Sequence, residues 1–565
     1  MRSLPSLPRL SVLALAFAVA ACNALLGDDF TVVDAAGGSG GTATGTATTA
    51  GSGGTGTGTQ QGGNGGAQGQ QDFSFSILPT SVNVPYDGTN YVEVEVLRSG
   101  GFDGAVEVTV QGAPPGLTTS PLTVAGDSSS GLLEVGASGT LVLGTTFDLE
   151  LLATSGDLSH TDSVPAVVTG TPGTFDESFG TAGLASWQVG TDGGGVDAIR
   201  EVAQQKILVA GNEFNGMAIN LSGARLLSDG TMDTSFDTDG IIEAHFCGCT
   251  KTGVGVGVLR AVNGNVYFVG WASEGSGYSD DVALLRLKDD GTPDDDVPHD
   301  GGMNLFDLGT DSDDHALAME PDANDRPTIT GEMDGQLFVA RIGDLQFGGM
   351  DSSYGTGGLV LPTLGASASA GQAIGIDSSG NAVVAGFVDR ATRDLVVLRL
   401  TPAGALDATF GNAGVLEITR PGAQEAAGVA IRPDDSIVIA GITDETSANQ
   451  DIFVLQVTPG GALDTAFGNS GITVVSTPAT EEAVGIALML DQRILVAGND
   501  TGPLIARFLA DGTPDPTYGT NGRQSINLGT DGEAGAITVA ASGMTLLGGV
   551  RGSYPADGVV ARIWN

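Results

Sequence analysis

Three neighbouring residues have side chains that suit metal or redox chemistry. His245, Cys247 and Cys249 would present three soft ligands on one face of a straight strand, which is a partial zinc set. Structural zinc normally takes a fourth ligand, and Gly248 favours a bend at this point. In an oxidising compartment a local Cys247–Cys249 disulfide is the simplest outcome. Free thiols and a metal site are the alternatives.

Acidic side chains recur at one position of a repeat that is described below. Glu425, Glu482 and Glu533 occupy this position, and Asp197, Asp313 and Asp314 lie close to it. Equivalent loops of a ring-shaped repeat protein lie on one face around its axis, and clustered carboxylate oxygens suit Ca²⁺. We therefore hypothesise a ring of carboxylates that binds Ca²⁺, and we expect no other cofactor. The alternative is that some of the 67 acidic residues align by chance on solvated loops.

The sequence contains no motif that identifies an enzyme class. Its four histidines are dispersed, and it has no nucleophile elbow, P-loop or His-Glu-x-x-His pattern. Paired carboxylates for glycoside cleavage stay open, because their separation is set by the tertiary structure. The net charge of −45, from 22 basic and 67 acidic residues, disfavours nucleic acid and anionic membrane surfaces as partners. We therefore expect a protein that is not an enzyme.

An Asp-x-x-(Phe/Tyr)-Gly-x-x-Gly motif recurs at intervals of 51 to 61 residues. Its seven copies begin at Asp176, Asp233, Asp294, Asp351, Asp407, Asp464 and Asp515. Asp237 replaces a glycine in the second copy, and Val297 replaces the aromatic residue in the third. Each unit also has a glycine that ends a β-branched run, as at Gly441. About four short strands per unit predict an all-β fold with a seven-bladed β-propeller, and a β-solenoid is the alternative.

An arginine, or Gln456 once, lies eight residues before the motif aspartate in five of six cases. This spacing predicts a structural Arg–Asp pair that spans the turn between one blade and the next. Arg562 has no following aspartate, and Asp176 has no preceding arginine. A closed ring would bring these two together, so we predict an Arg562–Asp176 contact. The alternative is a set of solvated arginines on strand edges, where surface ion pairs contribute only about 0–1 kcal/mol.

The repeat resembles the delta-60 repeat family, whose members carry DxxFGxxG motifs followed by an ILVAG-like strand. The matching stretches are DESFGTAG with KILVAG, DATFGNAG with SIVIAG, and DTAFGNSG with RILVAG. The resemblance covers residues 174–565. It implies a secreted or surface-exposed propeller with an unknown ligand, and it carries over no catalytic residue.

Residues 1–21 are typical of a bacterial lipoprotein signal peptide. Arg2 and Arg9 precede a short apolar run, and Val19-Ala20-Ala21-Cys22 matches a lipobox. Cleavage before Cys22 would leave its thiol to carry the lipid, and Asn23 favours sorting to the outer membrane. The alternative is an ordinary secretory signal. We expect a protein anchored by lipid at the outer membrane or cell surface, on a face that the sequence leaves open.

A tether and a second β-domain separate the anchor from the repeats. Residues 22–72 include a stretch, 35–71, without any charged side chain. Such a Gly- and Thr-rich chain behaves as a flexible tether with an r.m.s. reach of roughly 35 Å. Residues 73–170 alternate valines with polar residues, which predicts an immunoglobulin-like sandwich. The stretch Phe102–Pro121 resembles bacterial Ig-like domains.

These features predict an acidic surface lipoprotein that acts as a non-catalytic binding scaffold through its propeller. The ligand is an unknown protein or polysaccharide, and the membrane is contacted through the lipid anchor. Two alternatives remain. One is an extracellular glycan-active enzyme with acids on one propeller face, and the other is a purely structural component of the cell surface.

Overall fold

The computed structural model describes residues 71–565, apart from 79–81, 87, 215–218, 245–252, 274–278, 295–301, 310–311, 344–348, 446–448 and 554. Cys22, the tether up to residue 70 and the Cys247–Cys249 pair lie outside these residues. The described part is built from β-strands in nine sheets, with one 3-10 turn, η1 (Ala203–Gln205). None of its helical segments has the length and apolar character that a membrane span needs.

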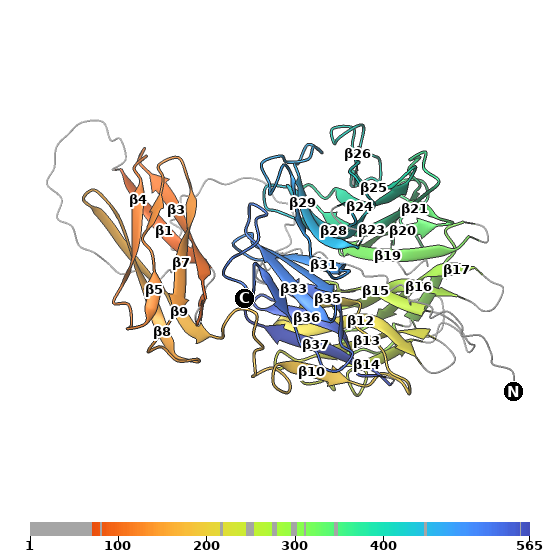
Figure 1. Cartoon of the computed structure of the whole chain (residues 1–565), viewed down its shortest axis with the longest axis horizontal. Coiled ribbons are helices and arrows are strands. Elements are labelled where there is room, and N and C mark those ends of the chain that lie inside the picture. Colours follow the sequence, from red (N-terminus) through yellow and green to blue (C-terminus); the bar gives the residue numbers. More distant parts are fainter. Residues whose placement is uncertain are drawn as a thin grey trace, which may run out of the picture.

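Two sheets form a sandwich that precedes the repeats (Figure 1). One has the order β1-β3-β7-β5, with β1 (Asp72–Leu78), β3 (Asn90–Ser99), β5 (Leu117–Thr119) and β7 (Ser130–Ala137). The other has the order β2-β9-β8-β4-β6, with β2 (Val82–Pro85), β4 (Val106–Gln111), β6 (Leu122–Val124), β8 (Thr146–Ser155) and β9 (Leu158–Thr169). Val92, Val94 and Val96 alternate into the shared core, as the period of a strand requires.

Seven four-stranded sheets follow, and we number them as ring sheets in chain order. The first has β11 (Ala198–Val202), β12 (Lys206–Phe214), β13 (Ile219–Leu226) and β14 (Ile241–Ala244), and the second has β15 (Gly253–Arg260), β16 (Val266–Ser273), β17 (Asp280–Leu287) and β18 (Met303–Phe306). The third has β19 (Asp314–Pro321), β20 (Pro327–Met333), β21 (Gln336–Arg341) and β22 (Leu359–Val360), and the fourth has β23 (Ala368–Ile376), β24 (Ala382–Asp389), β25 (Arg393–Leu400) and β26 (Val415–Ile418).

The remaining ring sheets follow the same plan. The fifth has β27 (Gln424–Ile431), β28 (Ile437–Thr443), β29 (Asp451–Val457) and β30 (Ile472–Val475), and the sixth has β31 (Glu482–Leu488), β32 (Ile494–Asn499), β33 (Pro503–Phe508) and β34 (Arg523–Ser525). The seventh has β35 (Glu533–Val539), β36 (Thr545–Arg551), β37 (Asp557–Ile563) and, from the start of the repeats, β10 (Leu184–Trp187).

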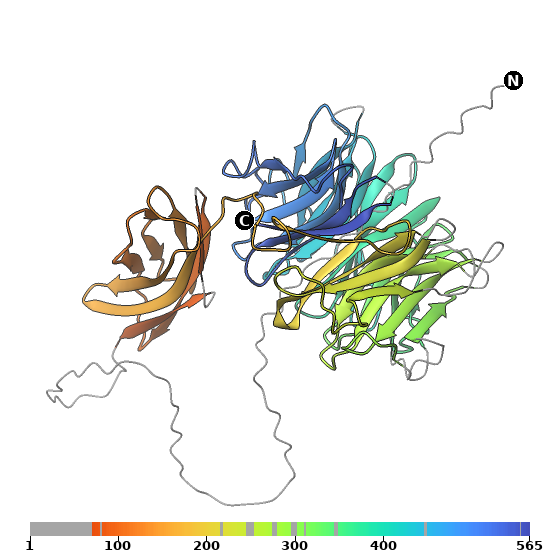
Figure 2. The same ribbon diagram turned by 90° about the horizontal axis from the view of Figure 1, so that it is seen from below.

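The seven sheets close into a ring (Figure 2). The first strand of each sheet is its inner strand and contacts the inner strand of the next, and β35 contacts β11 to complete the circle. The strand β10 pairs antiparallel with β37, so the beginning and the end of the repeat region share one sheet. Separate apolar clusters fill the spaces between neighbouring sheets.

A β-bulge interrupts six of the seven inner strands, and it explains the repeated glycine of the second strand. The register shifts by one residue in β15, β19, β23, β27, β31 and β35. The residue before each bulge pairs with this glycine, and the carbonyl oxygen one residue earlier would lie between 1.7 and 2.3 Å from an added β-carbon. Only glycine leaves room for that carbonyl, so the sequence ends its apolar run there.

Candidate functional site

Six of the seven motif aspartates are ion-paired within the ring, and Asp464 is hydrogen-bonded to Gln456 instead. Each accepts a hydrogen bond from the arginine of the third strand of its own sheet, or from Gln456 Nε2, at 2.6 to 2.8 Å. The turn concerned joins the third and fourth strands of one sheet, so the expectation that the pair spans the turn between two blades is wrong. The eight residues between the arginine and the aspartate instead correspond to the turn between the third and fourth strands of a single sheet.

The rest of the motif completes a joint between neighbouring sheets. A Ser or Thr hydroxyl two residues after the aspartate donates to its Oδ1 in five copies. The motif aromatic ring lies under the arginine guanidinium with the Cζ atom 4.4 to 4.8 Å from the ring centroid in five sheets. The arginine also reaches the next ring sheet: Arg399 Nη1, for example, donates a hydrogen bond to Pro459 O at 2.6 Å. The motif therefore stabilises the ring.

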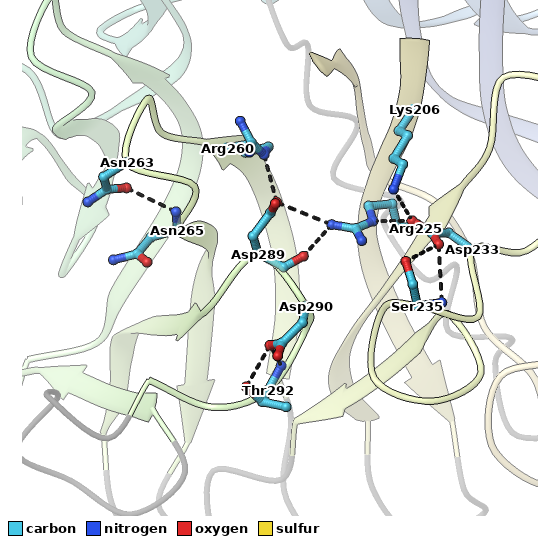
Figure 3. Close-up of polar contacts among 10 residues, drawn as sticks. All are labelled: Lys206, Arg225, Asp233, Ser235, Arg260, Asn263, Asn265, Asp289, Asp290 and Thr292. Atoms are coloured by element: carbon cyan, nitrogen blue, oxygen red, sulfur yellow. Dashed lines mark hydrogen bonds and ion pairs between the residues drawn. The ribbon is translucent and has the colours of Figure 1, made fainter. Parts of the chain in front are cut away.

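The first ring sheet shows this joint in detail (Figure 3). Arg225 lies between Asp233 and Asp289, and it contacts the main-chain oxygen of Asp289 in the next sheet at 2.5 Å. Burial alone would raise the pKa of Asp233. Hydrogen bonds from Lys206 and Ser235, together with the Arg225 charge, hold this pKa far below its usual range. The carboxylate is thus fixed in its charged form.

Arg562 and Asp176 make the same joint across the closure of the ring. Arg562 Nη2 lies 2.6 Å from Asp176 Oδ2, although 386 residues separate them in sequence. Asp176 is 3% exposed. The predicted contact is therefore present, and it links β37 to the first copy of the motif.

The three glutamates of the hypothesised Ca²⁺ ring share one register of their sheets. Glu425, Glu482 and Glu533 each pair with the residue after the repeated glycine. Glu425 is bound by Arg393 of the preceding sheet. Burial raises the pKa of Glu482, and the charge of Glu533 adds to this. Among the described residues, the one group of three possible metal ligands contains none of them.

The position one residue before the register of these glutamates carries buried hydrogen-bond acceptors, of which the sequence analysis named only Asp314. Asp314, Ser369 and Glu481 occupy it in three sheets, and each accepts a main-chain N–H from the preceding sheet at 2.6 to 3.0 Å. Glu481 is fully buried and is also paired with Arg523. Of the three, only Glu481 directly precedes one of the glutamates in the sequence, and the burial of all three depends on the neighbouring sheet.

A carboxylate triad lies where the second and third ring sheets meet. Oxygens of Asp281, Asp307 and Asp314 all lie within 4.8 Å of one another. They come from β17, from the end of β18 and from the start of β19. Burial raises the pKa of Asp314, the Asp307 and Asp334 carboxylates add to this, and hydrogen bonds from Leu308 and Ser312 oppose it. Three hard oxygen donors at this separation are chemically suited to Ca²⁺.

His315 lies beside this triad as an imidazolium between two carboxylates. Its Nε2 is 2.8 Å from Asp280 and its Nδ1 is 3.3 Å from Glu332, and the ring packs against Trp271 at 4.5 Å between centroids. Burial lowers the pKa of His315, but the hydrogen bonds and charges of Glu332 and Asp280 outweigh it and raise the pKa to about 9. We name Asp280, Asp281, Asp307, Asp314, Glu332, His315 and Trp271 the acidic patch.

The stability of the protein should fall as the pH rises from about 6.5 to about 9. The folded state holds the His315 proton more tightly than the unfolded chain, whose pKa is 6.5. Protonated His315 therefore contributes roughly 3 kcal/mol to the free energy of unfolding. This contribution is complete below pH 6.5 and is lost as the pH passes the pKa of the folded state. Denaturant titrations at pH 6, 7.5 and 9.5 on wild type and His315→Gln measure it. Parallel pH profiles for the two proteins would contradict the assignment.

A second set of perturbed carboxyl groups lies on the inner strands. Arg200 of β11 reaches Glu320 of β19 at 2.9 Å, and these strands belong to sheets that are not neighbours. Burial raises the pKa of Glu320 to about 7 against the effect of Arg200. Burial also raises the pKa of Asp197 to about 7, although Asn212 donates to it at 2.9 Å. These groups change protonation near neutral pH.

Three of the solved structures to which the chain is similar are distant likenesses. A protein of unknown function from Bacteroides caccae is 13% identical over 37% of this chain and 61% of that chain, with a TM-score of 0.25, so the chain spans about three fifths of its length. A DUF4784 family protein from Bacteroides caccae ATCC 43185 is 9% identical over 80% of this chain and 98% of that chain, with a TM-score of 0.22. Domains 4–9 of the surface layer protein SbsC are 12% identical over 77% and 70%, with a TM-score of 0.15.

Comparison of the sequence with family models gives a match within the ring. No curated protein matches the sequence. The model "Domain of unknown function (DUF5122) beta-propeller" matches residues 432–467 and 491–518. Each matched segment contains the second and third strands of a ring sheet and ends at the aromatic residue of the motif. The all-β chain therefore contains a β-propeller-type domain of unknown function.

Proposed function

We propose that this chain is a surface-anchored lipoprotein whose ring, a seven-bladed β-propeller, is a non-catalytic binding scaffold. In this proposal residues 1–21 are the signal peptide and 22–72 the lipidated tether. Residues 73–170 are an Ig-like sandwich and 174–565 the propeller. The lipobox before Cys22 supports the anchor. The seven four-stranded sheets support the propeller, and the valine core shared by two sheets supports the sandwich.

The acidic patch is the observation that carries the binding function. Six of the seven repeated aspartates are ion-paired with the repeated arginines at the joints between sheets. The patch, by contrast, gathers acidic residues at a single junction in the part of the chain that the structure describes. Carboxylates around an aromatic ring and a shared oxygen triad favour a positively charged group on the ligand, or a cation that the ligand shares. An unknown protein or polysaccharide could present either.

A thermal-shift screen of the chain with Ca²⁺, Mg²⁺ and a panel of polysaccharides, with and without EDTA, tests this function. We expect a saturable rise in melting temperature that Asp307→Asn removes. Asp307 is exposed, so its substitution should leave the fold intact. Glu482→Gln is the matched control, because it lies outside the triad and should respond as the wild type does. A wild-type protein that responds to no ligand, or equal responses in Asp307→Asn and wild type, would contradict binding at the patch.

Glycan-active chemistry is the second candidate, and the perturbed carboxyl groups favour it. Asp197 and Glu320 have pKa values near 7, which suit a general acid or base. Both are bonded to other side chains, Asn212 and Arg200, which argues for a structural role. A polysaccharide that raises the melting temperature in the same screen and is then cleaved by the protein would favour the enzyme.

A further inference from the structure

One joint of the ring lacks a hydrogen-bond acceptor that four other joints have. The Nη1 atoms of Arg225, Arg341, Arg399 and Arg562 each donate to a main-chain oxygen in the turn of the next sheet, at 2.5 to 2.8 Å. Arg507 Nη1, between the sixth and seventh ring sheets, has no hydrogen-bond partner among the described residues. The missing acceptor distinguishes this joint, which we call the closing seam.

Arg507 is otherwise held as its equivalents are. Its Nε donates to Asp515 at 2.8 Å and its Nη2 to Thr517 at 3.1 Å, and its side chain is 0% exposed. A buried guanidinium N–H without an acceptor is costly, because nothing replaces its hydration. Burial and the nearby Arg493 charge lower the pKa of Arg507 to about 10, in spite of Asp515. Arg493 is itself paired with Asp491 at 2.6 Å, so what the closing seam lacks is an acceptor for Arg507 Nη1.

Tyr518 adds a second donor at the same place. Its ring lies under the Arg507 guanidinium, 4.4 Å from Cζ to the centroid, and its hydroxyl is buried without a partner in the described structure. Tyr354 also has a buried hydroxyl without a partner, but Arg341 above it donates to Pro402 O. A buried tyrosine hydroxyl without a partner therefore does not by itself distinguish the closing seam. What distinguishes the seam is that this hydroxyl and Arg507 Nη1 both lack an acceptor in the described structure.

The path of the chain explains why the acceptor is missing. At the other joints, the acceptor oxygen belongs to the continuous turn between the third strand of the next sheet and its motif aspartate. In the seventh sheet β37 ends at Ile563, and the motif arrives from the linker after β9. Gly173, at φ 82°, takes the place of the turn glycine and bonds to Trp564 O at 2.8 Å, as Gly461 does to Thr458 O. The turn is made from two separate segments.

The closing seam is adjacent to the cavity between the sandwich and the ring. This cavity has a volume of about 1400 Å³ and is lined by Gly173, Gln524 and Trp564 among others. A β-carbon added at Gly173 would lie 3.4 Å from the Tyr518 ring, so the seam begins directly behind the cavity wall. Arg493, the second cation of the seam, contacts Tyr91 of the sandwich with its Cζ 5.4 Å from the ring centroid.

We infer that the closing seam binds a carboxylate group, which enters from this cavity and accepts hydrogen bonds from Arg507 Nη1 and the Tyr518 hydroxyl. A carboxylate supplies two acceptor oxygens, one for each of the two buried donors that have no partner in the described structure, and a charge-assisted hydrogen bond to a guanidinium is a strong one. This inference is independent of cation binding at the acidic patch.

Formate, the smallest carboxylate, is the probe for the full chain. We expect formate to raise the melting temperature saturably by about 2 °C relative to sodium chloride at equal ionic strength. Arg507→Gln should remove this rise, and the variant should fold because Gln456 bonds to Asp464 at 2.8 Å in the fifth sheet. Arg399→Gln is the matched control, since its Nη1 already has an acceptor, and it should keep the formate response.

Tyr518→Phe gives a second and milder test. Phenylalanine occupies this position in other copies, as at Phe410 and Phe467, so the fold should tolerate it. The variant should bind formate several-fold more weakly, whereas Tyr354→Phe should behave as the wild type. A wild type without a formate response up to about 100 mM, or the same response in Arg507→Gln, would show that the seam holds water only and would overturn the inference.

Discussion

Replacing Arg562 with alanine should lower the free energy of unfolding by about 3–5 kcal/mol, because it leaves a buried carboxylate without its cation. Asp176 is 3% exposed and lies 2.6 Å from Arg562 Nη2. The same guanidinium donates to Ser228 O at 2.5 Å and lies over Phe179. One side chain therefore connects the seventh sheet, the first motif and the first ring sheet. Denaturant titration measures the loss.

Arg562→Gln is the control that separates the loss of the positive charge from the loss of the hydrogen bond to Asp176. Gln456 shows that a glutamine at this position donates to the motif aspartate at 2.8 Å. Arg562→Gln should therefore lose only about 1–2 kcal/mol. Hydrogen exchange should quicken first in β10 and β37, which the pair holds together. A loss below 1 kcal/mol for Arg562→Ala, or exchange that quickens equally in all sheets, would show that this pair does not control closure.

Gly386→Ala should destabilise the fourth ring sheet by about 3 kcal/mol or prevent folding, because overpacking here meets main-chain atoms. An added β-carbon would lie 1.8 Å from Ala370 O, and a main-chain oxygen at a β-bulge cannot move without breaking the ladder. If the close atom belonged to a side chain, that side chain could rotate away from the added β-carbon. The melting temperature and the denaturant midpoint measure the effect.

Gly502→Ala is the matched control for this substitution. An added β-carbon at Gly502 meets no atom within 4 Å, and its backbone does not adopt a left-handed conformation. Its stability should therefore stay within about 0.5 kcal/mol of wild type. Similar losses in Gly386→Ala and Gly502→Ala would mean that the repeated glycine acts through chain entropy and not through the close carbonyl.

The repeat could be read from the sequence because its determinants are local. An arginine and an aspartate eight residues apart meet across one turn, whatever the rest of the chain does, and the aromatic residue three positions later reaches the same guanidinium. Period-2 alternation in the sandwich is equally local. The Arg562–Asp176 contact followed from the same rule once the ring was assumed to close.

Only the tertiary structure decided how the remaining charges are grouped. Glu425 has the same register as Glu482, but Arg393 from the preceding sheet binds it, and no spacing within one repeat shows that. Asp281, Asp307 and Asp314 come from two sheets, and Arg507 Nη1 lacks an acceptor in the described structure because the turn of the next sheet is built from two distant segments. The sequence by itself determined the repeated joints, whose partners are near in the chain. The tertiary structure decided the acidic patch and the closing seam, because their energies depend on partners that only packing brings together.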